Sequence, residues 1–358
     1  MATERLIAAT PQTTDQEWAG PTLRPDSMDE YIGQADLLEK LEIAIEAAKA
    51  RATGNVADGV ARPHEPLEHV LLHGPPGLGK TTLAHVIAQE MGTKLITTSG
   101  PALARGNDLV AALTRLQPGD VLFIDEIHRM PIAVEEFIYP AMEDFKIDVT
   151  VDTGMHARTV QIRCKPFTLI GATTRAGLLS APLRSRFGIT HHLRYYSRDD
   201  LRVILHRSCR VMGLVSVEEA CLEAISARSR GTPRIANRLL RRVRDFAQVR
   251  ANGVVSESLV ETALGLEGVD ELGLDDLDRN YLRTIATVYD GGPVGLETVA
   301  ATMNEDAGTL EDVVEPYLLQ IGFLARTRRG RMLTRAAAEH LGITTLNFDR
   351  DGLYEPEA

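Results

Sequence analysis

The sequence is poor in cysteine and has no long apolar runs. Three cysteines, Cys164, Cys209 and Cys221, stand far apart, with no CxxC pair and no histidine at ligand spacing. This spacing argues against a structural zinc site and favours reduced thiols, which are typical of cytoplasmic proteins. No stretch of about eighteen apolar residues occurs, so no membrane-spanning helix is expected. The N-terminus lacks the basic and apolar segments of a secretory signal, and residues 1–20 are expected to be a disordered leader.

Positive charge is scarce overall but dense at one place. The formal net charge of the 358 residues is −11, yet LARTRRGRMLT holds Arg326, Arg328, Arg329 and Arg331 within six positions. Such a concentration in an acidic chain suggests that something negative binds there, since arginine forks suit phosphate oxygens. Taken alone, however, a charge cluster of this kind is more often a solvated hairpin.

Hydrophobic periodicity predicts a chain of several domains, as its length also suggests. After the leader, short apolar strands alternate with helices, which is typical of a mostly parallel α/β sheet. The run KIDVTVDTGMHARTVQI interrupts this alternation and is expected to be an inserted β-hairpin. An all-helical region follows, and then three short helices and a two-stranded ribbon in the order of a winged helix. The expected boundaries are 21–196 for the large α/β domain, 197–268 for the small helical domain, 269–345 for the winged helix and 346–358 for a tail.

The strongest motif is GPPGLGKTT, which fits the P-loop pattern and lies between an expected strand and an expected helix. Gly74, Gly77 and Gly79 let the backbone wrap closely around phosphates, with N–H groups pointing inward at a helix N-terminus. Lys80 is expected to neutralise the β- and γ-phosphates, and the hydroxyl of Thr81 to bind Mg²⁺. A chance glycine-rich turn is the alternative, and the flanking strand and helix argue against it.

A second motif, VLFIDEIH, ends an apolar strand in two carboxylates. Asp125 is expected near the water shell of the metal, and Glu126 is placed to polarise an attacking water molecule. A DE pair after a strand is weak on its own. It becomes a strong signal because it follows a good P-loop at the usual separation.

The two motifs resemble those of the AAA+ ATPases, and three further segments extend the resemblance. LIGATTR places Thr174 at the family's first sensor of the γ-phosphate, and GTPR places Arg234 at its second sensor. RSRFG places Arg186 at the arginine finger, which in the family reaches the nucleotide of a neighbouring subunit, whereas Arg184 is expected to be structural. Each residue alone could be a solvated arginine or β-branched filler. The order of all five motifs favours the functional interpretation.

The resemblance implies ATP and Mg²⁺ as cofactors and enlarges the nucleotide site. LRPDSMDEYIGQ resembles the segment that enters the family's site on the adenine side. Catalytic roles are implied for Lys80, Asp125, Glu126, Thr174, Arg186 and Arg234, and metal contacts for Thr81 and Asp125. Nucleotide contacts are implied for Leu23, Arg24, Tyr31, Ile32, Gly74, Gly77, Gly79, Lys80, Thr81, Thr82, Glu143, Asp144, Phe145, Arg186, Tyr196 and Arg234.

Segments spread over all three expected domains are similar to those of one AAA+ group, the bacterial motors of Holliday-junction branch migration. This closer resemblance implies a hexameric ring that pulls duplex DNA during recombination and repair, together with a junction-binding partner subunit. It implies that Val160 and Ile162 on the hairpin dock that partner, although a hairpin packed on its own domain is nearly as good a reading of either residue.

The same resemblance assigns DNA contacts to the basic cluster. It implies phosphate contacts from Arg326, Arg328 and Arg331, and leaves Arg329 unassigned. Phosphate contacts position a protein without reading bases, which suits a motor that moves over any sequence. This chain departs from the group at Ala307, where the resemblance implies a basic residue, so one fewer backbone contact is expected here.

Two other functions share parts of this pattern. A clamp-loader or initiator-type switch would bind ATP and DNA through the same motifs without processive translocation. A protein-unfolding AAA+ machine would need an aromatic-hydrophobic pore loop and an adaptor domain, and the sequence shows neither. The terminal winged helix also disfavours an unfoldase.

Overall fold

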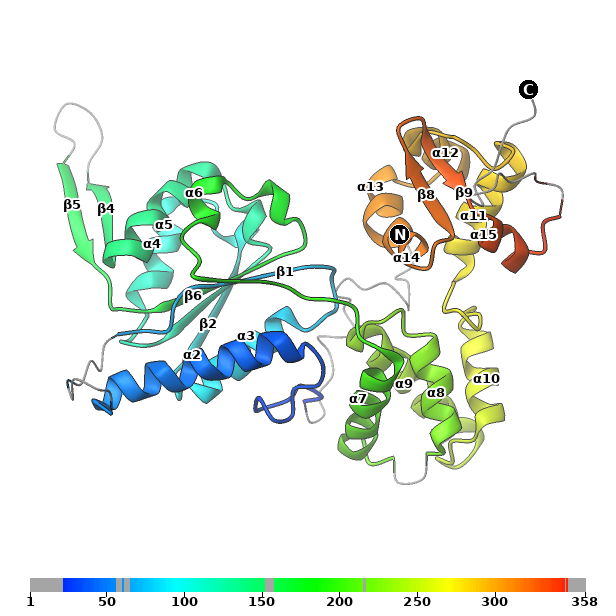
Figure 1. Cartoon of the computed structure of the whole chain (residues 1–358), viewed down its shortest axis with the longest axis horizontal. Helices are drawn as coiled ribbons and strands as arrows, with labels where there is room; N and C mark the ends of the chain where they lie inside the picture. The colour runs from blue at the N-terminus through cyan, green and yellow to red at the C-terminus, as the bar shows by residue number, and fades with distance from the viewer. Residues whose placement is uncertain are drawn as a thin grey trace. The chain divides into compact units, whose positions relative to one another are not determined.

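The computed structural model describes residues 22–55, 60, 65–151, 158–214, 217–344 and 346. The expected leader, the turn of the expected hairpin and nearly all of the expected tail lie outside these residues. The chain divides into two compact units (Figure 1). One comprises Thr22–Asp200, and the other contains the described residues from Leu201 onward. No helix of the described residues is long and apolar enough to cross a membrane.

A parallel five-stranded sheet forms the centre of the unit Thr22–Asp200. The strand order is β2-β3-β6-β1-β7. The strands are β1 Val70–His73, β2 Leu95–Ser99, β3 Val121–Asp125, β6 Thr168–Thr173 and β7 Ile189–His192. All six residues of β6 are buried, as expected for a central strand covered on both faces by helices. The predicted alternation of strands and helices is therefore confirmed.

Amphipathic helices cover the two faces of this sheet (Figure 1). They are α2 Ala35–Thr53, α3 Lys80–Glu90, α4 Gly106–Thr114, α5 Ile132–Asp144 and the short α6 Ala181–Arg184. In α3, Leu83, Val86 and Ile87 are fully buried, which is the three-to-four-residue spacing of a core-facing stripe. The packing of α3 on the sheet fixes the position of the loop that precedes it.

The predicted hairpin is present between α5 and β6. It consists of β4 Lys146–Val151 and β5 Arg158–Arg163, which pair in antiparallel register with Ile147 opposite Ile162. Ile147 is fully buried, so the base of the hairpin is anchored in the core of the unit, while the rest projects from it (Figure 1).

The second unit contains the small helical domain, called the lid below, and the winged helix, called the head. The lid helices are α7 Arg198–Val211, α8 Glu219–Ala227, α9 Pro233–Arg250 and α10 Glu257–Leu266. The head consists of α11 Asp276–Val288, α12 Leu296–Met303, α13 Ala307–Thr309, a π-helical turn Leu310–Val314, α14 Glu315–Gln320, β8 Leu324–Thr327, β9 Gly330–Leu333 and α15 Arg335–His340. Val294 pairs with Arg331 and adds a third strand position to the predicted ribbon.

Candidate nucleotide site and DNA-contact surface

The P-loop follows β1 and leads into α3. Gly74, Gly77 and Gly79 all have positive φ angles, 136°, 81° and 94°, which side chains rarely adopt. A Cβ atom at Gly74 would lie 2.6 Å from the carbonyl oxygen of Leu193, and one at Gly79 would lie 2.8 Å from the hydroxyl of Tyr31. Glycine is therefore favoured at Gly74 and Gly79 by both conformation and space, and at Gly77 by conformation. The loop keeps the narrow backbone cradle that phosphates need.

Lys80 is buried inside this loop. Its Nζ atom donates hydrogen bonds to the carbonyl oxygens of Gly74 and Pro75, both at 2.8 Å. The ammonium group thus lies within the curve of the loop, at the N-terminus of α3. A bound polyphosphate would place its negative charge against this ammonium group. Thr81 and Thr82 follow in the first turn of α3 and are half-buried.

Two tyrosines that are far apart in the sequence meet on the P-loop. The Tyr196 hydroxyl donates to the Tyr31 hydroxyl at 3.2 Å, and both hydroxyls approach the carbonyl oxygen of Leu78, at 3.2 Å and 3.5 Å respectively. Burial is the main reason that the pKa of Tyr31 is raised and that the pKa of Tyr196 is raised to about 12, so both stay neutral. The structure therefore brings together two aromatic residues of the predicted nucleotide site, the base-pocket candidate Tyr31 and Tyr196.

The other adenine-side candidates lie on the segment that leads to Tyr31. Arg24 is close enough to His85 in α3 that its charge lowers the pKa of that histidine, after the larger effect of burial. Leu23 and Ile32 are half-buried. Their contact with a base stays a prediction.

The strand order explains how the carboxylates and the first sensor meet. β6 lies between β1 and β3, so the residue after β6 lies between the P-loop and the end of β3. The Thr174 hydroxyl donates to Oε2 of Glu126 at 3.2 Å, and Asp125 Oδ1 accepts from the backbone N–H of Glu126 at 2.9 Å. The three predicted catalytic residues Asp125, Glu126 and Thr174 therefore form one cluster at the carboxyl edge of the sheet.

His128 belongs to this cluster, although the sequence analysis did not single it out. Its Nδ1 atom lies 3.1 Å from Oε2 of Glu126 and 2.9 Å from the hydroxyl of Thr173. Burial lowers the pKa of His128, and the opposing effect of Glu126 does not restore it, so the ring is neutral at neutral pH. Glu126 is thus held by a hydroxyl and an imidazole. A lone histidine after DE gave no signal that it would turn back onto the glutamate.

Arg186 lies in the loop after α6, and its side chain packs against α5. Its guanidinium carbon lies 4.4 Å from the centre of the Tyr139 ring, NH2 lies 3.1 Å from Oε1 of Glu143, and NH1 donates to the Pro182 carbonyl oxygen at 2.7 Å. The Tyr139 hydroxyl in turn donates to the buried carboxylate of Glu135 at 2.5 Å. A ring and a carboxylate therefore hold the guanidinium in place.

Arg186 and the P-loop lie at opposite edges of the sheet. Arg186 precedes β7, whose first residue Ile189 donates its N–H to the carbonyl oxygen of His69, immediately before β1. The P-loop instead follows the other end of β1, and four strand residues separate the two ends by roughly 13 Å. The amino edge of the sheet therefore carries the predicted arginine finger, and the carboxyl edge carries the phosphate cradle.

Glu143, Asp144 and Phe145 also lie at the amino edge, at the end of α5. The imidazole Nε2 of His69 lies 3.1 Å from the carbonyl oxygen of Met142, just before this segment. The structure thus places the segment beside Arg186 and not beside the P-loop of the same chain. Any nucleotide contact from it has to be made to another subunit.

Arg234 lies in the other compact unit. It occupies the first turn of α9, directly after Pro233, and is half-buried. Proline at the first helical position suits its fixed φ angle and missing N–H, so the helix begins sharply there. Its role as second sensor stays a prediction.

In the head, two arginines predicted to contact DNA, Arg326 and Arg331, donate hydrogen bonds to the same carboxylate. Glu315, which is fully buried, accepts from Nε of Arg326 at 2.8 Å and from Nε of Arg331 at 2.9 Å. The Tyr281 hydroxyl donates to the same carboxylate. Burial alone would raise the pKa of Glu315, but hydrogen bonds from Arg331, Tyr281 and Arg326 lower it below its ordinary value. The two arginines are therefore part of the head's packing as well as of its surface.

The remaining predicted residues differ in exposure. Arg328 and Arg329 are exposed in the turn between β8 and β9, whereas Ala307 packs partly against the core of the head. On the hairpin, Val160 is exposed, with 47% of its surface accessible, but Ile162 packs against the core cluster of its own unit. Of the two predicted partner anchors, Val160 is the more exposed and Ile162 is half-buried, and the role of both stays a prediction.

The parallel sheet with its P-loop, sensor strand and helical lid defines a P-loop ATPase of the AAA+ class. Family models cover nearly the whole described chain: the Holliday junction DNA helicase RuvB P-loop domain at residues 23–193, the RuvB AAA lid domain at 196–270 and the RuvB C-terminal winged helix domain at 271–342. The chain belongs to the RuvB family.

Individual relatives agree with this assignment. The Holliday junction branch migration complex subunit RuvB of Desulfosudis oleivorans is 57% identical over 322 residues, which is 90% of each chain. The RuvB subunit of Kosmotoga olearia is 52% identical over 344 residues, 96% of each chain. A solved structure, the RuvB Holliday junction branch migration motor of Thermotoga maritima, is 50% identical and aligns with a TM-score of 0.78 over 89% of this chain and 98% of that one. The α/β sheet, inserted hairpin, helical lid and winged helix are thus confirmed as the fold.

Proposed function

We propose that this chain is the ATP-driven subunit that moves duplex DNA arms to drive branch migration of Holliday junctions. The observation that carries the proposal is the match to RuvB relatives across all three domains, including the winged helix that a nucleotide-binding domain alone does not need.

The P-loop fits Mg²⁺–ATP. Its glycine cradle is a place where a Cβ atom would meet the backbone or Tyr31, and Lys80 brings positive charge into it. The hydroxyl of Thr81 and the carboxylate of Asp125 are the groups suited to the metal, which would neutralise charge that develops on the phosphates. Tyr31 and Tyr196 close the loop from the side where the resemblance places the base.

Hydrolysis needs a group that orients and polarises water. Glu126 fills this role, because it directly follows Asp125 and its carboxylate is held by Thr174 and His128. A neutral His128 adds no positive charge beside the Glu126 carboxylate.

A complete site requires two subunits. Arg186 and the P-loop of one chain lie at opposite edges of the sheet, so Arg186 would reach the nucleotide of a neighbour. The Glu143–Phe145 segment would approach the same nucleotide, since it lies beside Arg186. Repetition of this contact gives the ring, a hexamer by resemblance, in which each boundary holds one ATP.

The head is the DNA-contacting part. Arg326, Arg328 and Arg331 suit phosphate oxygens, and Glu315 fixes two of them in one orientation. The hairpin would bind RuvA, the junction-binding subunit, through Val160, and RuvC is a further partner that the resemblance implies. Hydrolysis at the ring boundaries would move the heads along the backbone of the duplex.

The proposal is tested with a synthetic four-way junction, RuvA and this protein. ATP should convert the junction into two duplex products, and Lys80→Ala, which removes the phosphate-neutralising charge, should give none. An intact ATPase that yields no product with RuvA would favour the loader or initiator-type switch instead.

A further inference from the structure

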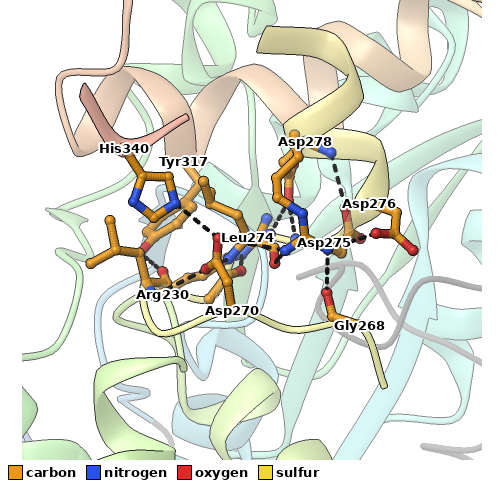
Figure 2. A network of polar contacts seen from close by, with 12 residues as sticks. Arg230, Gly268, Asp270, Leu274, Asp275, Asp276, Asp278, Tyr317 and His340 are labelled. Atoms are coloured by element: carbon orange, nitrogen blue, oxygen red, sulfur yellow. Dashed lines mark hydrogen bonds and ion pairs between the residues drawn. The ribbon is translucent and has the colours of Figure 1, made fainter. Parts of the chain in front are cut away.

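Arg230, in the turn between α8 and α9 of the lid, is almost fully buried and has a positive φ of 51°. Its partner Asp278 lies on α11 of the head and is completely buried. A charged pair this deep requires close complementarity, because an unpaired charge in such a place is strongly unfavourable. The pair therefore forms part of a specific, closely packed interface between lid and head, called the joint below (Figure 2).

The Arg230 guanidinium binds three parts of the other domain at once. Nε donates to the Gly273 carbonyl oxygen at 2.8 Å in the linker, NH2 forms an ion pair with Asp278, and the guanidinium carbon lies 4.7 Å from the Tyr317 ring centre. The Tyr317 hydroxyl donates to the Leu272 carbonyl oxygen at 2.6 Å. A planar fork with several donors and a stacking face can make all three contacts, and a lysine ammonium cannot.

The linker between lid and head is itself closely packed. A Cβ atom at Gly273, where φ is 79°, would lie 2.5 Å from the carbonyl oxygen of Arg228. Asp270 accepts from the backbone N–H groups of Leu272 and Leu274 at 3.0 Å and 2.8 Å, and its other oxygen lies 2.9 Å from Nε2 of His340 in α15. The linker is thus tied to the lid at one side and to the last helix of the head at the other.

The same turn carries the predicted second sensor. Arg230, Gly231, Thr232 and Pro233 lead directly into Arg234, and the N–H and hydroxyl of Thr232 both donate to the Ser229 carbonyl oxygen, at 3.0 Å and 3.2 Å. The residue that holds the head is therefore four positions from the residue predicted to contact the nucleotide, within one hydrogen-bonded turn.

We propose that Arg230 holds lid and head together as one rigid body. A nucleotide-dependent movement of the lid at Arg234 then moves the head by the same rotation and translation. Arg230 is a positioning residue: it is buried between lid and head and makes the head follow the lid. The rigidity itself depends only on the joint, whereas its use in moving DNA rests on the proposed function.

Rigidity is measured by pulsed electron spin resonance between labels on exposed positions of the two domains. Val249→Cys in α9 and Val288→Cys in α11 are suitable, in a chain whose three native cysteines are replaced. One narrow distance distribution is expected, the same with ADP and with ATPγS. A lid–head distance that differs between the two nucleotides would overturn the proposal, whether or not the protein moves DNA.

Variants of the joint test its consequence. Arg230→Lys and Asp278→Asn should broaden the distance distribution and lower junction products per ATP hydrolysed by about tenfold, within the usual range of coupling between sites. ATPase and duplex binding should persist. Glu261→Gln is the matched control, since it breaks an Arg228–Glu261 pair of 2.7 Å that lies wholly within the lid.

Thermal melting shows whether each variant folds. If a variant does not fold, Gly273→Ala is used in its place, because the added methyl group pushes the linker away from Arg228 without removing a charge. Arg230→Lys with a wild-type distance distribution and wild-type coupling would refute the role of the guanidinium. If the distances behave as expected but the unmodified protein moves no junction, the proposed function fails and the rigid joint stands.

Discussion

Arg326 and Arg331 lie directly opposite each other in the β8–β9 ribbon, and their guanidinium groups share the one buried carboxylate of Glu315. This arrangement restricts both side chains before any DNA arrives. If phosphates bind to these arginines as proposed, binding would cost less side-chain entropy than it would for unrestrained arginines. The same arrangement means that removal of either arginine affects stability as well as binding.

Arg331→Ala and Arg328→Ala should therefore behave differently. Arg331→Ala leaves the buried Glu315 short of a partner, so the free energy of unfolding should fall by up to about 3–5 kcal/mol, and duplex affinity should fall too. Arg328→Ala removes an exposed charge, so stability should stay within about 0.5 kcal/mol. Its slope of log K against log salt should still shrink by about 0.9 for one lost phosphate contact. Urea unfolding measures the stability of each variant, and salt titrations of duplex binding measure the slope. Equal stability of the two variants would contradict the role of Glu315.

Mixed subunits test the shared nucleotide site. Arg186→Ala should lower ATPase by about 10³–10⁵ with nucleotide binding retained, and Lys80→Ala should abolish phosphate binding. A mixture of the two inactive variants should regain part of the activity, because a P-loop from one and Arg186 from the other complete some boundaries. A mixture as inactive as its components would show that Arg186 does not act between subunits.

The hairpin should separate partner binding from stability. Val160→Asp places a charge on an exposed surface, so RuvA binding should be lost while ATPase and melting temperature persist. Ile162→Asp should instead destabilise the protein, since Ile162 packs on the core of its own unit. Binding to immobilised RuvA and thermal melting distinguish them, and unaltered binding by Val160→Asp would exclude it as an anchor.

The free energy of unfolding should fall between pH 7.5 and 5.5 because several partly buried histidines have lowered pKa values. Burial is the first cause of a lowered pKa at His69, His73, His85, His128 and His191. The unfolded chain takes up these protons more readily, so the stabilisation is complete above a pH of about 6.5 and declines as the pH falls below it. Denaturant unfolding at pH 7.5 and 5.5 should show lower stability at pH 5.5. An equal or higher value would contradict the lowered pKa values.

Local patterns predicted much of this structure. The P-loop, the DE strand end and the inserted hairpin are each encoded within short segments, and periodicity was sufficient to find them. Strand β7 and helix α15 were not predicted, because ITHH and RAAAEH are short and carry weak signals. Neither has a hydrophobic pattern long enough to separate it from a loop.

The residues that were missed depend on tertiary contacts. Glu315 in VEPYLLQ reads as an ordinary solvated helix residue, and only the folded ribbon brings two arginines onto it. Arg230 is a similar case, since it gains its role from a partner more than forty positions away. His128 acts on the nearby Glu126, but the folded chain also brings its ring onto Thr173. The position of Glu143 beside Arg186 likewise required the strand order, which sequence periodicity does not supply.

If Arg186 completes the nucleotide site of a neighbour, the two edges of the sheet give each subunit a donating side and an accepting side. Subunits of this kind associate front to back, in a heterologous contact that closes into a ring when the rotation per step allows it. Every member of such a ring faces the same way, so its two openings differ chemically. A duplex passing through such a ring would meet two chemically different openings, as a consequence of the separation of Arg186 from Lys80 within one chain.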